Sequence, residues 1–321
     1  MNFKKICVVG AGYWGKNHLR TLSELNVLFG VVEKNKNSLN QILKKYPKIK
    51  GFSSVKKSLM YGNFDGYTIA TPAETHYDLA KKIIKAKKHV LVEKPLALNV
   101  PDVKELIKLS IDHSVNLMVG HVLLFHPAIR KIKEIINSGI IGKLQYIYSN
   151  RLNLGQVRTE ENVFWSLAPH DIAIFQYLTG TYPEKIKASG STFLQKGIPD
   201  STITQLEYKN NIKGHIFVSW LHPFKEHRLV VIGSDAMISF EDSKEDKPLK
   251  LYSKGFIFNN QVPEKVDGPV ELIDYEKKMP LAEELSFFIK SFDSGNISLA
   301  DGYHGLEVVK ILVEASRQLE K

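Results

Sequence analysis

Short apolar runs alternate with amphipathic stretches over the first 121 residues. Uninterrupted apolar runs are typical of strands buried on both faces, and apolar positions that recur every three or four residues are typical of helices packed against them. The predicted strands are Ile6–Val9, Leu28–Val32, Gly66–Ala70, Val90–Val92 and Leu117–Val119. The predicted helices are Asn17–Glu24, Ser38–Tyr46, Tyr77–Ala86 and Val100–His113. This alternation predicts an α/β domain over residues 1–121, with a parallel sheet and helices on both faces.

The pattern changes after residue 121. An amphipathic helix is predicted over Pro127–Asn137, and longer segments with alternating apolar and polar positions follow, as in antiparallel hairpins. These predicted strands are Leu144–Leu152, Ile186–Phe193, Thr202–Tyr208, Lys213–Trp220, Leu229–Ile232 and Met237–Phe240. Further helices are predicted over Asn162–Leu178, Leu281–Phe292 and His304–Leu319. Residues 122–321 are therefore predicted to form a second, α+β domain with a mostly antiparallel sheet.

Composition narrows the class of protein. The 321 residues carry a net charge of +10 and a single cysteine, Cys7, in the first predicted strand. Much of the lysine lies on polar helix faces, so a solvated basic surface is the plain interpretation, and attraction of an anionic substrate is the sharper one. The chain has no basic arm or module typical of nucleic-acid binding, and no apolar stretch that predicts a membrane span or a signal peptide. One buried cysteine fits a reducing cytoplasm.

A glycine-rich turn closes the first predicted strand. Gly10, Gly12 and Gly15 form the pattern G-x-G-x-x-G, with Tyr13 and Trp14 inside it, and a predicted helix follows. In this setting the glycines permit a tight turn, a close backbone approach to pyrophosphate, and close packing of the helix on the strand. The amides that open the helix are then available to phosphate groups. The segment therefore predicts a dinucleotide site.

Glu33 ends the second predicted strand and follows Gly15 by 18 positions, near the spacing of about 20 that the motif expects of its ribose-binding acid. A carboxylate there repels a 2′-phosphate, so the predicted cofactor is NAD rather than NADP. Lys34 and Lys36 follow and partly offset that repulsion. An ordinary acid at the end of a strand is the weaker interpretation.

Lys94 stands between Glu93 and Pro95, directly after a predicted buried strand. Ligands of open parallel sheets bind outside the carboxyl ends of the strands, and Pro95 restricts the residue before it to extended backbone. A lysine aimed from this edge of the sheet is suited to stabilise negative charge that develops on a reacting oxygen.

The cofactor turn and three later motifs together resemble the glucose–fructose oxidoreductase / inositol dehydrogenase / MocA superfamily over nearly the whole chain. These motifs are Gly10–Gly15, Ala70–His76, Val92–Ala97 and Trp165–Asp171. The resemblance implies a Rossmann domain followed by an open-faced, mainly antiparallel sheet domain that assembles into homodimers or homotetramers. It also implies that Thr71, Pro72, His76 and Glu93 line the cofactor.

The same resemblance assigns the chemistry of alcohol oxidation to two residues. Lys94 matches the lysine that lies near the nicotinamide and the substrate hydroxyl, and His170 matches the usual general base. An imidazole has a pKa close to working pH, which suits removal of a hydroxyl proton. The alternative for His170 is a packed histidine at a helix start, since Pro169 precedes it. Many relatives carry Asp four residues before the histidine, where this chain has Ser166.

The segments around Arg151 and Trp165 are similar to the branch of the superfamily that oxidises UDP-N-acetylglucosamine at C3, whose product a partner aminotransferase aminates for lipopolysaccharide or other surface glycan synthesis. Substrate contacts are therefore expected from Arg151, Asn153, Trp165 and Ser166. A guanidinium grips a diphosphate through two parallel hydrogen bonds. Pairing of Arg151 with a local acid such as Glu160 or Glu161 is an equally open interpretation.

Three hypotheses about function are left by the sequence. The leading one is an NAD-dependent sugar-nucleotide 3-dehydrogenase. The second keeps the scaffold and takes an inositol or a free sugar, or reduces a 3-keto sugar. The third is an idle NAD-binding sensor or scaffold, which the presence of both Lys94 and His170 disfavours. No histidine spacing predicts a metal site.

Overall fold

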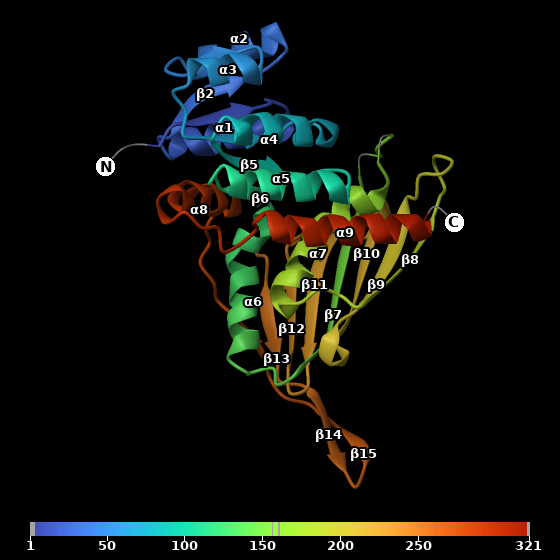
Figure 1. Ribbon diagram of the computed structural model, residues 1–321. Coiled ribbons are helices and arrows are strands. Elements are labelled where there is room, and N and C mark those ends of the chain that lie inside the picture. Colours follow the sequence, from blue (N-terminus) through green and yellow to red (C-terminus); the bar gives the residue numbers. More distant parts are fainter. Residues whose placement is uncertain (1–3, 156, 160, 320–321) are drawn as a thin grey trace. The chain divides into compact units, whose positions relative to one another are not determined.

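A computed structural model describes residues 4–155, 157–159 and 161–319 (Figure 1). The chain divides into two compact units. The first unit combines Met1–Phe125 with Lys278–Lys310, and the second combines His126–Lys277 with Ile311–Lys321. The domain boundary between residues 121 and 122 stays a prediction; the compact units divide the chain at Phe125 and also return residues 278–310 to the first unit.

The first unit contains a six-stranded parallel sheet in the order β3-β2-β1-β4-β5-β6. The strands are β1 (Ile6–Val9), β2 (Leu28–Val32), β3 (Lys50–Phe52), β4 (Gly66–Ile69), β5 (His89–Glu93) and β6 (Leu117–Gly120). Every residue of β1 and β4 is buried, because helices leave no face of these central strands to water. The order reverses beside β1, between β1 and β4, which is the position where sheets of this kind bind ligands at their carboxyl edge.

Most of the helices beside this sheet connect its strands. They are α1 (Tyr13–Glu24), α2 (Lys36–Lys45), α3 (Val55–Tyr61), α4 (His76–Lys85), α5 (Val100–Asp112) and, from the later part of the chain, α8 (Pro280–Ser294), with short 3₁₀ turns η1 (Ala73–Thr75) and η2 (Val122–Phe125). Three of them start at side chains that accept a hydrogen bond from the first turn: Asn35, Ser54 and Asn99. The short elements β3 and α3 were not among the predicted ones.

The second unit is built on an eight-stranded sheet in the order β16-β13-β12-β11-β7-β10-β9-β8. The strands are β7 (Leu144–Leu154), β8 (Lys185–Ser191), β9 (Ser201–Glu207), β10 (Lys213–Ser219), β11 (Leu221–Gly233), β12 (Met237–Glu241), β13 (Leu249–Tyr252) and β16 (Val270–Leu272). All neighbours are antiparallel except β7 and β10, which run parallel.

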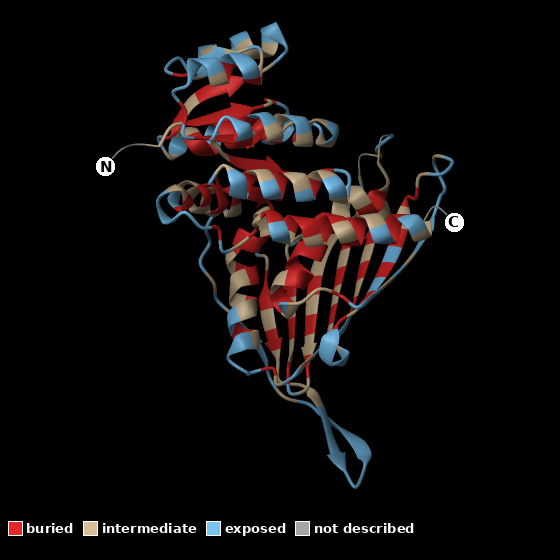
Figure 2. Ribbon diagram, viewed as in Figure 1, coloured by how far each residue is buried: buried red, intermediate tan, exposed pale blue. Residues whose placement is uncertain are grey.

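One face of this sheet is covered by α7 (Val163–Thr179), which packs on β7, β9 and β10, while α6 (Pro127–Asn137) packs against α7. Buried and half-exposed residues alternate along the strands, as Figure 2 shows, because successive side chains point to opposite faces. Ile147 and Ser149 are fully buried, whereas Tyr148 between them is half-exposed. The predicted fold class, a Rossmann α/β domain and an open-faced, mostly antiparallel α+β domain, is confirmed.

Two further elements complete the chain. A hairpin of β14 (Gly255–Asn259) and β15 (Val262–Val266) stands apart from the large sheet, and nearly all its residues are exposed (Figures 1 and 2). The C-terminal helix α9 (Gly302–Leu319) contributes residues to both units. Within the part of the chain that the structure describes, no helix has the length and apolar character needed to cross a bilayer.

Candidate functional site

The glycine turn after β1 has a geometry that only glycine permits. Gly10 has φ of +89°, and a Cβ there would lie 2.7 Å from the carbonyl oxygen of Ala70. A Cβ on Gly15 would lie 2.1 Å from the carbonyl oxygen of Gly10, so the helix packs directly on the turn. A Cβ on Gly12 would meet nothing within 4 Å. The backbone at Gly12 is thus open to a ligand, whereas Gly10 and Gly15 are closely packed against other backbone atoms.

The start of α1 leaves its amides available. Gly12 is the N-cap, no side chain caps it, and no acidic residue lies in the first turn. Anions are stabilised at such a helix start by the unpaired N–H groups and by the helix dipole. Tyr13 and Trp14 occupy this turn with 83% and 39% of their surfaces exposed, and their rings meet edge to face at 6.3 Å.

Glu33 follows β2 and reaches back to the turn. Its Oε2 accepts a hydrogen bond from the amide of Ala11 at 3.0 Å, and its Oε1 accepts one from the amide of Asn35 at 2.9 Å. The carboxylate is therefore fixed beside the glycine turn by two backbone donors. An acid held at this point is placed to meet a ribose hydroxyl and to oppose a 2′-phosphate.

A cavity of about 1210 Å³ opens along the carboxyl ends of β1, β2 and β4. Five of the residues expected at the cofactor line it, namely Gly10, Gly12, Glu33, Thr71 and Pro72. The donor set fits NAD, because an open glycine backbone and a helix start suit a diphosphate and Glu33 suits a ribose. When NAD is the occupant, these residues would hold its diphosphate and adenosine ribose.

The cavity also has lining residues that the sequence analysis missed. Ser54 and Lys56 come from the start of α3, and Asp78 comes from α4. The Ser54 side chain accepts a hydrogen bond from the amide of Lys57 at 3.3 Å, so it is a helix cap as well as a lining residue. A serine directly before a helical pattern was the available signal, but α3 has only seven residues and was not predicted.

His76 is buried and joins two strand ends. Its Nδ1 lies 2.8 Å from the carbonyl oxygen of Pro95, and its Nε2 lies 2.8 Å from the carbonyl oxygen of Thr71. Both partners are acceptors, so the imidazole donates to one when neutral and to both when protonated. The ring thus ties the loop after β4 to the loop that carries Lys94.

Lys94 follows β5 at the same carboxyl edge of the sheet as the cavity. The Lys94–Pro95 peptide bond is cis, and Lys94 is half-buried between the buried residues Glu93 and Pro95. His121, in the same unit, is buried, and its pKa is held well below its usual range by burial first and then by the charges of His304 and Lys94. The lysine after β5 and the histidine after β6 are therefore coupled electrostatically, and the coupling favours the neutral imidazole.

His170 lies inside α7 rather than at its start. The helix begins after Asn162, whose side chain accepts a hydrogen bond from the amide of Trp165 at 3.1 Å, and Pro169 sits within the helix. The proline therefore was misleading as a helix-start signal, and the helix-start interpretation of His170 is wrong. Ser166 lies four residues before His170, so both lie on one face of α7.

Arg151 is buried on β7 and paired with Asp171. Its Nε donates to Oδ2 of Asp171 at 2.7 Å, and its Nη2 donates to Oδ1 at 3.0 Å. Burial would lower the pKa of Arg151, but the charge and hydrogen bonds of Asp171 outweigh it and raise the pKa. Of the acids named from the sequence, Glu160 lies outside the described residues. The partner is Asp171, which the sequence analysis did not consider for this role.

The other three residues expected to contact the substrate, Trp165, Asn153 and Ser166, also lie in the second unit. Trp165 donates from Nε1 to Oγ of Ser316 at 2.7 Å. Asn153 lies over Gly155, since a Cβ on Gly155 would come 2.5 Å from Oδ1 of Asn153. Ser166 is half-exposed.

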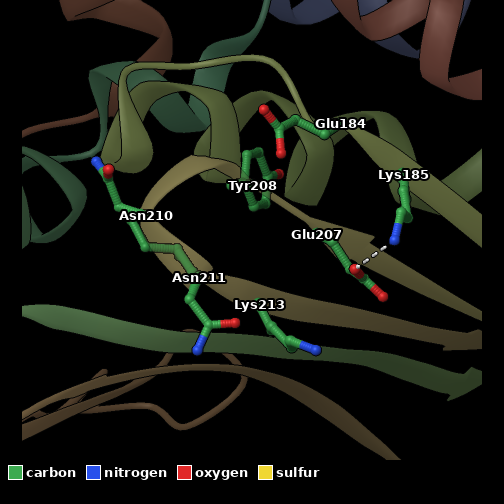
Figure 3. Close-up of a pocket in the computed structure, with 8 residues that line it drawn as sticks. Glu184, Lys185, Glu207, Tyr208, Asn210, Asn211 and Lys213 are labelled. Atoms are coloured by element: carbon green, nitrogen blue, oxygen red, sulfur yellow. Dashed lines mark ion pairs between the residues drawn. The ribbon is translucent and has the colours of Figure 1, made fainter.

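A second cavity of about 240 Å³ lies at one end of β8, β9 and β10. Figure 3 shows this cavity with the Lys185 side chain turned toward Glu207. The Nζ of Lys185 lies 3.7 Å from Oε2 of Glu207. Its remaining lining residues include Glu184, Tyr208 and Lys213, and none of the expected site residues is among them. Among the described residues, no cluster of three or more His, Cys, Asp or Glu side chains is arranged to hold a metal ion.

Comparisons with known proteins follow the same division of the chain. Residues 4–121 match the Gfo/Idh/MocA oxidoreductase family model, described as an NAD-binding Rossmann fold, and residues 129–239 match the Gfo/Idh/MocA C-terminal domain. Myo-inositol 2-dehydrogenase of Thermotoga maritima is 24% identical, with 99% of this chain and 96% of the relative aligned. UDP-N-acetylglucosamine 3-dehydrogenase of Acidithiobacillus ferrooxidans is 25% identical, with 97% of each aligned. A solved structure of the latter enzyme superposes with a TM-score of 0.87 at 23% identity, covering 100% of this chain and 98% of that one.

Proposed function

Because the chain belongs to the Gfo/Idh/MocA family of NAD-binding oxidoreductases, we propose that it oxidises a nucleotide sugar, UDP-N-acetylglucosamine, to its 3-keto form. One structural relationship carries this proposal. The dinucleotide cavity lies at the carboxyl ends of β1, β2 and β4, and β5, the strand next to β4, ends directly before Lys94. A cation that follows the adjacent strand end suits a redox site better than a site that only binds nucleotide.

Two side chains carry the proposed chemistry. Lys94 stabilises the negative charge that develops on the hydroxyl oxygen as its carbon loses hydride. His170 removes the hydroxyl proton, for which an imidazole is well matched near neutral pH. NAD, when bound, accepts the hydride. Ser166, four residues before His170, offers this histidine a neutral hydroxyl rather than a carboxylate.

The substrate assignment has its support in the sequence motifs over residues 146–155 and 162–171 and in the similarity to a UDP-N-acetylglucosamine 3-dehydrogenase. A 3-keto sugar nucleotide is a ketone, which a transaminase can convert to an amine. A pathway aminotransferase is therefore the proposed partner enzyme. Trp165, Asn153 and Ser166 are the proposed contacts to the sugar.

A second candidate, oxidation of an inositol or another uncharged polyol, is favoured by Arg151. The Nε and Nη2 of this guanidinium donate hydrogen bonds to Asp171. The group that was expected to bind a diphosphate therefore forms a buried ion pair instead. The similarity to myo-inositol 2-dehydrogenase is of the same order as that to the sugar-nucleotide enzyme. Arg151 is therefore not among the proposed contacts to the substrate phosphates.

We further propose that the chain forms a homodimer or homotetramer. The uncovered face of the second unit's sheet carries half-exposed apolar and aromatic side chains, among them Tyr148, Phe217, Val230 and Ile232. Apolar and aromatic side chains on an uncovered sheet face are typical of protein interfaces. Sedimentation velocity of the purified chain tests this: a monomer at micromolar concentration would contradict it.

The assay that tests the activity follows NADH absorbance with NAD and a panel of UDP-sugars, free hexoses and inositols. Oxidation of a secondary alcohol can stop at an unfavourable equilibrium, so a transaminase with its amino donor, or a carbonyl trap, is added to each reaction. Turnover with UDP-N-acetylglucosamine supports the leading proposal. Turnover confined to myo-inositol or free hexoses replaces it with the second candidate. NADH binding without turnover on any member of the panel would contradict both.

A further inference from the structure

Glu284, on α8, is a fully buried carboxyl group, with 0% of its surface exposed. Neither of its oxygens has a hydrogen-bond partner among the described residues. A buried polar group without a partner is costly, and an isolated buried carboxylate is far more costly than a neutral carboxylic acid. The side chain is therefore expected to carry a proton where an ordinary glutamate would be ionised.

The groups around Glu284 come from three elements of the same unit. Helix α8 packs against α1 and η2, and η2 (Val122–Phe125) has only apolar side chains. Glu93 at the end of β5 is the charged neighbour: burial first and the charge of Glu93 second raise the pKa of Glu284 well above its usual range. His18 of α1 is the group that faces Glu93, with Nε2 at 2.8 Å from Oε1.

Glu93 has little room to move. It is 9% exposed, and a Cβ on Gly120 of the neighbouring strand β6 would lie 2.9 Å from its Oε2. Glu93 has a hydrogen-bond partner in His18, whereas Glu284 has none, so of these two buried carboxyl groups Glu284 is the one that a proton stabilises.

We propose that Glu284 is a positioning residue for Lys94: it stays a neutral carboxylic acid, so that Glu93 is the single anion at the end of β5 and is held by His18. Lys94 follows Glu93 directly in the chain. If Glu284 ionised, its charge would push the Glu93 carboxylate away from His18 and shift the backbone from which Lys94 projects. The protonation of Glu284 stands on the structure alone, whereas its consequence for turnover rests on the proposed function.

Glu284→Gln is the diagnostic variant, because an amide has the shape of the carboxylic acid and cannot ionise. Glu283→Gln is the matched control, since Glu283 is the preceding residue of α8 and is half-exposed. In the wild type the folded state binds the Glu284 proton more tightly than the unfolded state. The stability contributed by that proton is complete below the ordinary glutamate pKa and is lost as the pH rises toward the raised value.

Two measurements that need no substrate decide the protonation state. Infrared spectra in D₂O at neutral pH are expected to show the carbonyl stretch of a protonated carboxylic acid in the wild type and in Glu283→Gln, and to lose it in Glu284→Gln. The melting temperature is expected to fall more steeply between pH 5 and 8 in the wild type and in Glu283→Gln than in Glu284→Gln. Spectra without the protonated band in the wild type, or identical pH slopes in all three proteins, would overturn the proposal.

Glu93→Gln tests the electrostatic coupling between Glu93 and Glu284 independently. It can be used if Glu284→Gln does not fold. Without the Glu93 charge, Glu284 ionises at lower pH, so the carboxylic-acid band is expected to disappear at a lower pH than in the wild type; an unchanged titration would contradict the pairing. With an active substrate, the wild type should lose kcat at alkaline pH and Glu284→Gln should not. If Glu284 is protonated but the wild type and Glu284→Gln have the same pH profile of kcat, the protonation is confirmed and the positioning role is overturned.

Discussion

Arg151 and Asp171 form a buried forked ion pair, with both carboxylate oxygens of Asp171 accepting from the guanidinium at 2.7 and 3.0 Å. The pair joins β7 to α7, so it fixes the helix that carries His170 to the sheet beneath it. Asp171 and His170 are neighbours on the helix and point in different directions. The ion pair therefore fixes the position of the helix turn that carries both Asp171 and His170.

Removing one partner of this ion pair is predicted to destabilise the second unit. Arg151→Met leaves Asp171 as a buried, uncompensated charge, and such changes cost about 3–5 kcal/mol in the free energy of unfolding. The double variant Arg151→Met/Asp171→Leu, which removes both charges, is expected to regain most of that loss. Urea denaturation measures the free energy of unfolding of the single and the double variant.

Arg228→Ala is the control, because the Arg228 side chain is 40% exposed beside Glu241 and a loss of no more than about 1 kcal/mol is expected. An Arg151→Met protein with wild-type stability and a raised KM only for diphosphate substrates would contradict the structural role and restore the substrate contact.

The fold was predictable where one physical rule dominates. Buried parallel strands are apolar throughout, and a turn that needs positive φ at Gly10 selects glycine, so the first strand, turn and helix follow from the sequence. The edge strand β3 was missed because its three residues, Lys50–Phe52, have no apolar pattern. Strands β14, β15 and β16 were missed for a related reason, because they are mostly exposed and have no core face to impose alternation. Strand β13 was missed although its four residues alternate between buried and half-exposed.

Site residues were predictable when a motif fixes their place and not when a distant partner does. The glycine turn and Glu33 lie on adjacent strands, and their spacing along the chain indicates the site. The partner of Arg151 lies 20 positions away on a helix, and the Glu93 charge that helps to raise the pKa of Glu284 comes from far along the chain. A sequence shows that such acids exist, but only the packing of α7 and α8 shows which buried group each one meets.

Glu33→Gln is predicted to weaken discrimination between the two cofactors. The variant keeps the side chain's shape but loses the charge that repels a 2′-phosphate and part of the charge-assisted bonding to the turn. Hydrogen bonds to charged groups contribute about 1.5–3 kcal/mol, so NADH binding is expected to weaken roughly tenfold while NADPH binding strengthens.

Fluorescence titration with both reduced cofactors measures this ratio. Glu74→Gln, which removes another carboxylate from the same cavity, is the control and should leave the NADH-to-NADPH preference close to wild type. An unchanged preference in Glu33→Gln would show that Glu33 does not select the cofactor.

Lys94→Ala is predicted to lower kcat by about 10²–10³-fold, the usual effect of removing one group that stabilises a developing oxyanion. His170→Ala is predicted to lower it by about 10²–10⁴-fold, as expected for a general base. Both variants should retain NADH affinity within a few-fold, measured by fluorescence. Lys104→Ala, an exposed lysine of α5, is the control. Near-normal rates in either variant would remove that residue from the proposed chemistry.

His126 is predicted to make the second unit sensitive to acid. The ring is 4% exposed against Phe240 and Tyr275 and caps α6 by accepting from the amide of Ala128, and burial lowers its pKa to about 4. A histidine whose folded pKa is lowered contributes stability that is complete above its unfolded value of 6.5 and is lost as the pH falls toward about 4. The loss over this window is of the order of 3 kcal/mol.

Urea denaturation at a series of pH values between 7 and 4 tests this prediction. His126→Asn keeps an N-cap acceptor while removing the titrating ring, so its free energy of unfolding should start lower than that of the wild type and fall less steeply with acid. His113→Asn is the control, because His113 is at the exposed end of α5 in the other unit and should leave the slope unchanged. Some slope is expected to persist in His126→Asn, since burial also lowers the pKa of His227 to about 3. Parallel pH curves for the wild type and His126→Asn would mean that His126 does not cause the acid sensitivity.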